Sequence, residues 1–364
     1  MLLRHIKVYM RKNKTFTYSE AINDALHIAM QKDKKMICYG LGVTDPKNVF
    51  STTINLKKIF GSDRVFDVPT SENALTGVSI GAALNGVRSV VTHQRLDFFL
   101  LAMDQLVNSA AKWYYMFGSR RPVPITIRLI IGRGWGQGPT HSQNLQAWFN
   151  HIPGIKVVMP SFADDAKGLL LSSIFDPNPV IFLEHRWLHN TSAIDKKKDY
   201  RVKIGKAKIC KAGRDITILS MSYLTLEALK AEKYLREKFR IKAEIIDLRS
   251  IKPLDWETIF KSIKKTKRLL ILDTGFTTGS VASEIITRVS IEKFRLLKTA
   301  PIRLAMPDVP EPTSPALTKN FYIHAHDIAI NVLRSLGIKY KNVKKDLVQL
   351  GPSDIPGKYF KGPF

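Results

Sequence analysis

The chain has 364 residues, of which 45% are hydrophobic and 24% charged, so it can bury a large core and form two domains. No apolar run reaches about 18 residues, the length that would predict a membrane span. The 57 Lys and Arg against 31 Asp and Glu give a net charge of +26. These basic residues are scattered, without an aromatic RNA-binding strand or zinc-finger spacing, which favours a lysine-rich surface over a nucleic-acid site.

Two features of the sequence indicate the cellular compartment. Cys38 and Cys210 fall in separate apolar segments, as buried thiols do in a reducing cytoplasm, so we expect a cytoplasmic protein. The first 19 residues lack acidic side chains, as a transit peptide would, but they are not rich in Ser or Arg. An ordinary lead-in is therefore favoured over an organelle signal.

Strand-like and helix-like segments alternate along residues 1–190, which predicts an α/β domain with a mainly parallel sheet. The expected helices are 17–31, 77–86, 100–117, 142–149 and 163–175, and the expected strands are 36–41, 90–93, 123–131, 155–160 and 179–185.

A polar segment, residues 191–203, contains three consecutive lysines and is predicted to be a linker. The same alternation resumes over residues 204–338, so we expect a second α/β domain there. The polar stretch 339–364, with Gly and Pro, is expected to form a loosely packed tail.

Glu72 stands out, because it follows a Pro-Thr-Ser turn and precedes a run of small residues, 77–86, that predicts a tightly packed helix. Such a position is the mouth of a strand-turn-helix unit, where α/β proteins bind ligands. The alternative is a carboxylate that only favours the helix N-terminus.

Three other motifs are weaker indications of a functional site. The glycine-rich loop 132–138 matches neither a dinucleotide fingerprint nor a P-loop, so we interpret it as a loop that brings His141 to a site. Glu184, His185 and His189 lack a further matched ligand, which makes metal binding there the less favoured reading. A G-x-S-x-G match at 77–81 lies inside the expected helix rather than at a hydrolase elbow.

A series of segments, in unbroken order over roughly residues 15–335, resembles the beta subunit of the thiamine-diphosphate-dependent 2-oxoacid dehydrogenase decarboxylase component, of the pyruvate dehydrogenase type. The segments are DVPTSE, GVSIGAALNGVR, AMDQLVNSAAKWYYM, RRPVPITIR, THSQNLQAWF, IPGIKVVMPS, DAKGLL, NPVIFLEH, IGKAKI and DLRSIKPLDWETI. The resemblance implies a transketolase-like pyrimidine-binding domain followed by a transketolase C-terminal domain, working in an α2β2 heterotetramer with an alpha subunit. In that family the alpha subunit holds the diphosphate and Mg²⁺, and this chain has no Gly-Asp-Gly diphosphate motif.

By position, the resemblance implies that Glu72 hydrogen-bonds the aminopyrimidine ring of thiamine diphosphate, that Phe98 packs on that ring and that His141 is the active-site histidine. A carboxyl that shares a proton with the ring favours the imino tautomer, which can remove the thiazolium C2 proton. The family's possible potassium site maps to Ile125, Ser173, Ile174, Asp176 and Asn178, although Pro177 interrupts that segment.

The sequence departs from the pyruvate enzymes at THQRLDF and at GRGWGQGPTH, which places polar groups near the expected site. If His93, Arg95 and Arg133 face a ligand there, together with Gln94, Asp97 and Gln137, the 2-oxoacid substrate should be more polar or more anionic than pyruvate. The alternative is that His93 and Arg95, which share one face of the strand, lie at a subunit interface.

The expected activity is therefore decarboxylation of a 2-oxoacid with acyl transfer to lipoamide. Two alternatives remain: transfer of the acyl or two-carbon unit to an aldehyde, as in transketolase, and a non-catalytic basic scaffold. The family often docks on a lipoyl acyltransferase core through a small basic domain, which a charge of +26 would repel. Either that partner is acidic here or the complex has no core.

Overall fold

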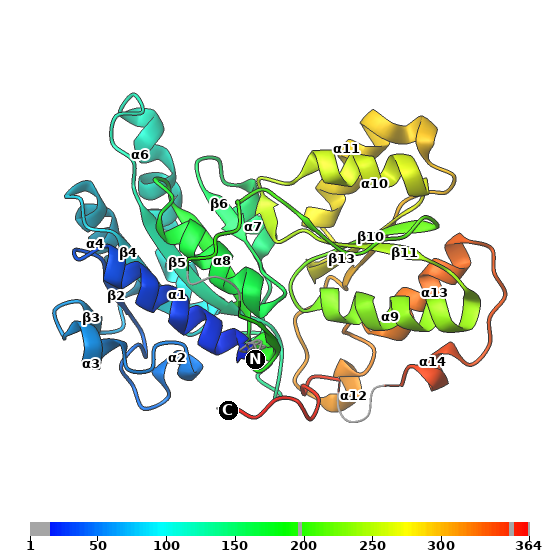
Figure 1. Cartoon of the computed structure of the whole chain (residues 1–364), viewed down its shortest axis with the longest axis horizontal. Coiled ribbons are helices and arrows are strands. Elements are labelled where there is room, and N and C mark those ends of the chain that lie inside the picture. The colour runs from blue at the N-terminus through cyan, green and yellow to red at the C-terminus, as the bar shows by residue number, and fades with distance from the viewer. Residues whose placement is uncertain (1–14, 196–198, 349–352, 363–364) are drawn as a thin grey trace, which may run out of the picture.

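A computed structural model describes residues 15–195, 199–348 and 353–362 of the chain. The expectations for the first 14 residues and for the three consecutive lysines of the linker lie outside these described residues. Two α/β domains lie side by side (Figure 1). In the first domain, helices α1 and α8 pack against one another on the same face of the sheet.

The first domain is built on a seven-stranded sheet with the order β12-β6-β7-β5-β4-β2-β3. Six of its strands run parallel, and β12 pairs antiparallel with β6. The strands are β2 (Ile37–Gly40), β3 (Val65–Asp67), β4 (Ser89–His93), β5 (Ile125–Ile131), β6 (Lys156–Val158), β7 (Val180–His185) and β12 (Ser250–Lys252). The helices are α1 (Tyr18–Lys32), α2 (Asn48–Ser51), α3 (Leu56–Phe60), α4 (Glu72–Leu84), α5 (Leu96–Phe99), η1 (Leu100–Ala102), η2 (Gln105–Ala110), α6 (Ala111–Met116), α7 (Gln146–His151), α8 (Ala163–Ile174) and η3 (Arg186–Leu188).

The second domain has a five-stranded sheet with the order β14-β13-β10-β11-β9, in which only β9 is antiparallel. Helices α10 and α11 cover one face, and α9 and α13 cover the other (Figure 1). The strands are β9 (Lys208–Lys211), β10 (Ile216–Ser220), β11 (Ala243–Asp247), β13 (Leu269–Phe276) and β14 (Ile302–Met306). The helices are α9 (Leu224–Phe239), α10 (Trp256–Thr266), α11 (Val281–Lys293), η4 (Phe294–Leu296), α12 (Pro315–Thr318), α13 (Ala325–Ser335) and α14 (Val343–Asp346).

Local sequence explains where several of these elements begin. Thr17 and Glu20 form a reciprocal capping box that satisfies backbone donors at the start of α1. Asp255 caps α10, where its side chain accepts a hydrogen bond from the Thr258 N–H. The central strands β4 and β5 are buried along their whole length, as expected for parallel strands covered on both faces.

Gly40, at the carboxyl end of β2, shows why one glycine is required in this sheet. Its φ is +148°, and a Cβ atom there would lie 2.1 Å from the Thr92 carbonyl oxygen. Any side chain would therefore push β2 away from β4. The glycine keeps the carboxyl ends of the central strands together.

These architectures confirm the expected α/β class, with a mainly parallel sheet followed by a second α/β domain. No helix among the described residues is both long and apolar enough to cross a membrane. The chain differs from the sequence expectation in the following four features, three of which involve contacts between segments that are distant in sequence.

Strand β12 belongs to the sheet of the first domain although it lies within residues 204–338. Within the expected linker, β8 (Ser192–Ile194) pairs antiparallel with β1 (Thr15–Thr17). The single helix expected at 100–117 is divided by the wider π-type turn of η2. The described tail residues 353–362 are not loosely packed, because they return to the first domain and bury Asp354 and Phe360.

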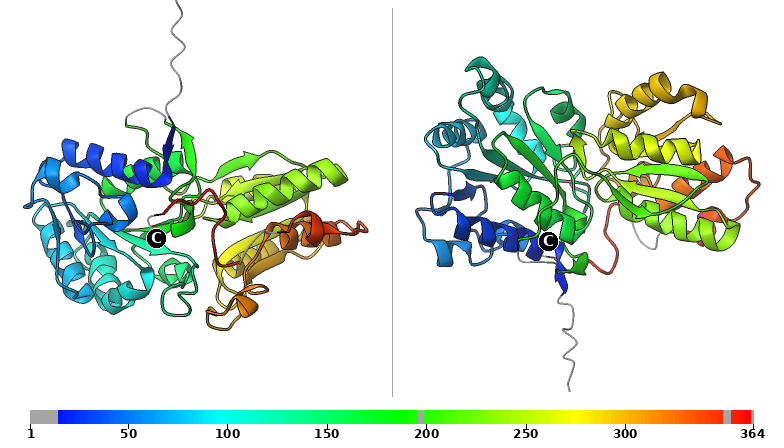
Figure 2. Two further views of the ribbon diagram at one scale, coloured as in Figure 1. Left: turned by 90° about the horizontal axis from the view of Figure 1, so that it is seen from below. Right: turned by 45° about the horizontal axis from the view of Figure 1, so that its top comes forward.

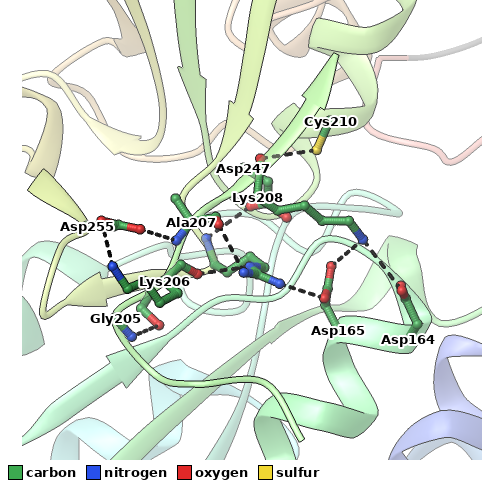
Figure 3. Close-up of polar contacts among 11 residues, drawn as sticks. Asp164, Asp165, Gly205, Lys206, Ala207, Lys208, Cys210, Asp247 and Asp255 are labelled. Atoms are coloured by element: carbon green, nitrogen blue, oxygen red, sulfur yellow. Dashed lines mark hydrogen bonds and ion pairs between the residues drawn. The ribbon is translucent and has the colours of Figure 1, made fainter. Parts of the chain in front are cut away.

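The junction between the domains carries a network of ionic contacts (Figure 3). Asp165 of α8 accepts from Arg249 Nη1 at 2.9 Å and from Lys208 Nζ at 2.7 Å. The Arg249 guanidinium also donates to the carbonyl oxygens of Lys206 and Ala207, both at 3.0 Å. A carboxylate of the first domain is thus bonded to two cations of the second, which fixes the two sheets relative to one another.

Candidate active site

Strand topology places the expected site residues on one edge of the first sheet. Strands β3, β4 and β5 are parallel, and their carboxyl ends therefore lie on the same side. Glu72 follows β3, Phe98 follows β4 and His141 follows β5. Ligands of α/β proteins bind in the crevice outside this edge of the sheet.

Glu72 is buried, and its carboxylate is available to bind a ligand. Glu72 is the first residue of α4 and is only 4% exposed. Its backbone carbonyl accepts a hydrogen bond from Thr76 Oγ1 at 3.0 Å, but no group among the described residues bonds to its carboxylate. Neither carboxylate oxygen is fully buried without a partner, so both remain accessible to a ligand or a partner chain that hydrogen-bonds to them.

Phe98 and His141 are brought into direct contact. Their ring centroids are 5.3 Å apart and the planes meet at 88°, so one ring edge points at the face of the other. The Nδ1 atom of His141 lies 3.0 Å from Thr140 Oγ1. That hydrogen bond occupies Nδ1 and leaves Nε2 for a substrate or cofactor.

Two further contacts tie the end of β4 to the loop after β5. Arg95 donates from Nη2 to the side-chain oxygen of Gln137, and Gln143 donates from Nε2 to Asp97 Oδ1 at 2.8 Å. Two of the polar residues singled out in the sequence, Arg95 and Gln137, therefore contact one another. Arg95 is buried, and its Nη1 has no partner among the described residues.

His93 does not take the position expected of a substrate contact. Its side chain is 0% exposed and packs edge-on against Phe99, with ring centroids 5.1 Å apart. Burial lowers the pKa of His93 to about 4, so the ring is neutral near pH 7. The residue is part of the core, because it is the last residue of a strand that is covered on both faces.

Arg133 is enclosed by aromatic rings at the domain junction. Its guanidinium carbon lies 4.4 Å from the Trp187 ring centroid and 4.2 Å from that of Tyr322. Burial lowers the pKa of Arg133. Planar stacking between two rings is a structural role that a guanidinium fills well. The contacts thus place Arg133 in the junction between β7 and the second domain.

The histidines considered as metal ligands have structural partners instead. His185 Nδ1 accepts a hydrogen bond from the Trp187 N–H, and His189 Nδ1 lies 3.1 Å from Arg186 Nη1. Glu184 forms a buried ion pair with Arg128 of β5 at 2.6 Å. No group of three or more His, Cys, Asp and Glu suited to a metal occurs among the residues that the structure describes.

The segment expected to bind potassium already carries cations. Arg88 Nη1 donates to the carbonyl oxygens of Ile174 and Asp176 at 3.1 and 3.3 Å. The Asp176 carboxylate is paired with Lys156 Nζ at 2.5 Å. Of the remaining residues, Ile125 and Ser173 are buried and the Asn178 N–H bonds to Asp176. A second cation would face two fixed positive charges, so the segment does not fit the ion and we assign it no role.

The structure has a groove beside His141 that was not predicted from the sequence. It has a volume of about 670 Å³ and is lined by Thr140 and Gln143 of the loop and by Asp308 and Glu311 of the second domain. Glu311 is 2% exposed, and burial, with a smaller effect of Asp97, raises its pKa to about 7. The only sequence signal was the proline-rich turn 307–312, because the groove forms where two distant loops meet.

Comparisons with known proteins agree with this geometry. The transketolase pyrimidine-binding domain family matches residues 14–191, and the transketolase C-terminal domain family matches residues 205–328. A solved structure titled "Split gene transketolase, inactive beta4 tetramer" superposes with a TM-score of 0.71, covering 89% of this chain and 99% of its own. Its sequence identity is 22%, so it shows the fold alone.

Closer relatives are similar over most of the chain. The mitochondrial pyruvate dehydrogenase E1 component subunit beta of Chaetomium thermophilum is 41% identical, covering 82% of this chain and 79% of that protein. The corresponding subunit of Pisum sativum is 39% identical (86% and 89%), and that of Caenorhabditis elegans is 38% identical (90% and 94%). The chain therefore belongs to the family of pyruvate dehydrogenase E1 beta subunits, the beta subunits of the thiamine-diphosphate-dependent 2-oxoacid dehydrogenase decarboxylase component.

Proposed function

We propose that this chain supplies the pyrimidine-side half of a thiamine-diphosphate-dependent 2-oxoacid decarboxylase that works only with an alpha subunit, in an α2β2 heterotetramer. One observation carries the proposal: Glu72, a residue that is only 4% exposed and whose carboxylate no described residue bonds, lies on the sheet edge that also holds the Phe98–His141 pair. When bound, the cofactor supplies the electron sink that decarboxylation of a 2-oxoacid requires.

Each side chain would have one task. The Glu72 carboxyl would share a proton with a ring nitrogen of the aminopyrimidine, and a hydrogen bond there would offset the cost of burying the carboxylate. Phe98 would pack against that ring. His141, with Nδ1 engaged by Thr140, would give or take a proton at Nε2 during acyl transfer.

The diphosphate and Mg²⁺ are assigned to the alpha subunit. Magnesium prefers carboxylate and phosphate oxygens in near-octahedral geometry. The described part of the chain offers no acidic cluster of that kind, and the sequence has no Gly-Asp-Gly diphosphate motif. A site divided between two subunits accounts for both observations.

For the substrate, the names of the relatives refer to pyruvate, and we propose a more polar or more anionic 2-oxoacid here. Support comes from Arg95, whose buried Nη1 could pair with a carboxylate or hydroxyl. Arg133 has two such atoms, because its Nε and Nη2 are also buried without a partner among the described residues, although its guanidinium lies against two aromatic rings. Pyruvate as the best substrate by kcat/KM, with Arg95→Ala harmless, would argue against this specificity.

The acyl acceptor decides between the remaining alternatives. Isolation of the native complex tests the function, followed by assays of several 2-oxoacids with lipoamide and with aldehydes as acceptors. We expect an alpha subunit and 2-oxoacid-dependent release of CO₂. Transfer to an aldehyde alone would favour a transketolase-like reaction, and absence of any activity would favour a basic scaffold. A lipoyl core, if it co-purifies, should be acidic, because a charge of +26 repels a basic docking domain.

The compartment stays a prediction. Both cysteines are free, and Cys38 is buried, which suits a reducing environment such as the cytoplasm. Several relatives are named as mitochondrial proteins. Localisation of the tagged full-length chain would decide, with cytoplasmic signal as the expected result.

A further inference from the structure

The described part of the C-terminal tail, residues 353–362, forms what we call the C-terminal strap. It returns from the second domain and crosses onto the first, where the red segment lies in Figure 2. It also lies beyond both segments that match the family models, residues 14–191 and 205–328. The matched segments therefore do not include the strap itself.

The first contact of the strap is with the glycine-rich loop that leads to His141. The Asp354 carbonyl oxygen accepts from the Trp135 N–H at 2.9 Å, and Asp354 Oδ2 accepts from the Gly136 N–H at 2.9 Å. Asp354 is itself only 4% exposed. One residue of the strap thus satisfies two consecutive backbone donors of the loop.

The fit between strap and loop is close. Gly134 has a φ of +147°, and a Cβ atom there would lie 2.9 Å from Trp187 Nε1 and 3.3 Å from the Asp354 carbonyl oxygen. A larger residue would separate the loop from both neighbours. The Trp135 ring also packs on Phe360 of the strap, with centroids 5.2 Å apart.

The far end of the strap is anchored on the segment after β7. The Arg186 guanidinium lies 4.7 Å from the centroid of the Phe360 ring, and Tyr359 donates its hydroxyl to the Trp187 carbonyl at 3.2 Å. The Asn190 side chain accepts from the Lys361 N–H at 2.6 Å and donates to the Gly362 carbonyl at 3.2 Å. The strap is therefore fixed to a rigid part of the first domain.

The loop needs such an external support. Its four glycines, at 132, 134, 136 and 138, all have positive φ, and glycine loses more backbone entropy on ordering than any other residue. The loop sequence has neither helix nor strand periodicity, so it is not expected to form regular secondary structure. Its own domain contributes the bond from Arg95 to Gln137, and the strap contributes the two bonds at Trp135 and Gly136.

We propose that the C-terminal strap positions the active-site loop, with Asp354 as a positioning residue that helps to hold His141 against Phe98. The role of His141 in catalysis rests on the proposed function, whereas the contact between strap and loop does not. A misplacement of about 1 Å can cost about a hundredfold in rate, so support of this loop has a direct kinetic consequence.

Hydrogen exchange at single-residue resolution tests the contact in the full chain without cofactor or partner. In Asp354→Ala, the Gly136 amide should exchange at least about tenfold faster, while the Trp135 amide, which bonds to a backbone oxygen, stays protected. A chain truncated after Val348 should lose protection at both amides. Asp354→Asn retains an acceptor and should behave as the native chain, and so should Lys358→Ala, which alters an exposed residue of the strap.

The kinetic arm uses the complex with its alpha subunit. Asp354→Ala should lower kcat by about tenfold with little change in KM for the 2-oxoacid, and Asp354→Asn should restore it. Unchanged exchange at Gly136 in Asp354→Ala would overturn the contact. Faster exchange with unchanged kcat would overturn the positioning role. Full activity of a Glu72→Gln complex would instead overturn the proposed function and leave the exchange result standing.

Discussion

At the scale of single residues, the proposed chemistry depends on Glu72. This residue is only 4% exposed, no described residue bonds to its carboxylate, and its place at the start of α4 favours the negative charge. A bound ring that shares a proton with this carboxylate would give it a role in general acid–base catalysis.

Glu72→Gln is therefore expected to leave folding and assembly intact and to lower turnover of the complex by about a hundred- to ten-thousand-fold. Glutamine retains the size and the hydrogen bonding of glutamate but cannot exchange a proton. Turnover is measured as 2-oxoacid-dependent CO₂ release, with assembly followed by gel filtration. An unchanged rate would reduce Glu72 to a carboxylate that only stabilises its helix.

Asp247 gives a prediction on pH and stability. Burial, and to a smaller extent the charge of Asp165, raises its pKa to about 7, whereas the pKa of an unfolded aspartate is about 4. The folded chain therefore binds this proton more tightly, and its stability should fall as pH rises from about 4 to 7, by at most about 1.4 kcal/mol per pH unit.

Asp247→Asn should remove this decline, because asparagine cannot ionise but still offers an oxygen to the Arg249 N–H. The measurement is the Tm of both chains between pH 5 and 8. The variant should gain stability relative to the native chain as pH rises. Parallel curves would show that Asp247 does not titrate in this range.

Residue roles were only partly predictable from sequence. The contact between Phe98 and His141 follows from parallel strands that end at one edge, a feature that alternating patterns reveal. His93 and Arg133 could not be placed, because whether a polar residue faces a ligand, the core or an aromatic stack depends on packing between distant segments. Glu311 and Asp354 escaped notice for the same reason.

At the scale of elements, the centre of the first sheet holds a buried ion pair. Arg128 of β5 and Glu184 of β7 are both 0% exposed, with 2.6 Å between Nη2 and Oε1. Arg128 also donates to Thr52 Oγ1 at 3.0 Å. Such a pair adds little net stability, but removal of one partner leaves a buried charge unpaired.

Glu184→Leu should consequently lower the free energy of unfolding by roughly 3–5 kcal/mol, as measured by denaturant titration. The double variant Arg128→Met/Glu184→Leu should recover most of that loss, since no charge is then left buried. A double variant as unstable as the single one would mean that the pair, and not the isolated charge, determines stability.

Elements were largely predictable and their partners were not. The helix at 163–175 and the strands at 123–131 and 179–185 were expected within a few residues of α8, β5 and β7. Residues 204–338 were all expected to belong to the second domain, yet β12 pairs with β6 of the first sheet. The sequence cannot indicate which sheet a short strand joins, because the strand has the same alternating pattern in either sheet.

At the scale of the whole molecule, several sets of contacts join the two α/β domains, including the contacts of Arg133 with Trp187 and Tyr322. The ionic network around Asp165 and strand β12 in the first sheet also join the domains, and the C-terminal strap bonds to the first domain. The site edge of the first sheet lies beside this domain junction, and the proposal is that an alpha subunit supplies the groups for the diphosphate and the metal.

The most direct test of this account is a titration of thiamine diphosphate with Mg²⁺, monitored by calorimetry, on the chain alone and on the chain with its alpha subunit. We predict no tight binding and no turnover by the chain alone, and both once the alpha subunit is present, with turnover lost in Glu72→Gln. Tight binding with turnover by the chain alone would contradict the central claim that this protein is half of a divided active site.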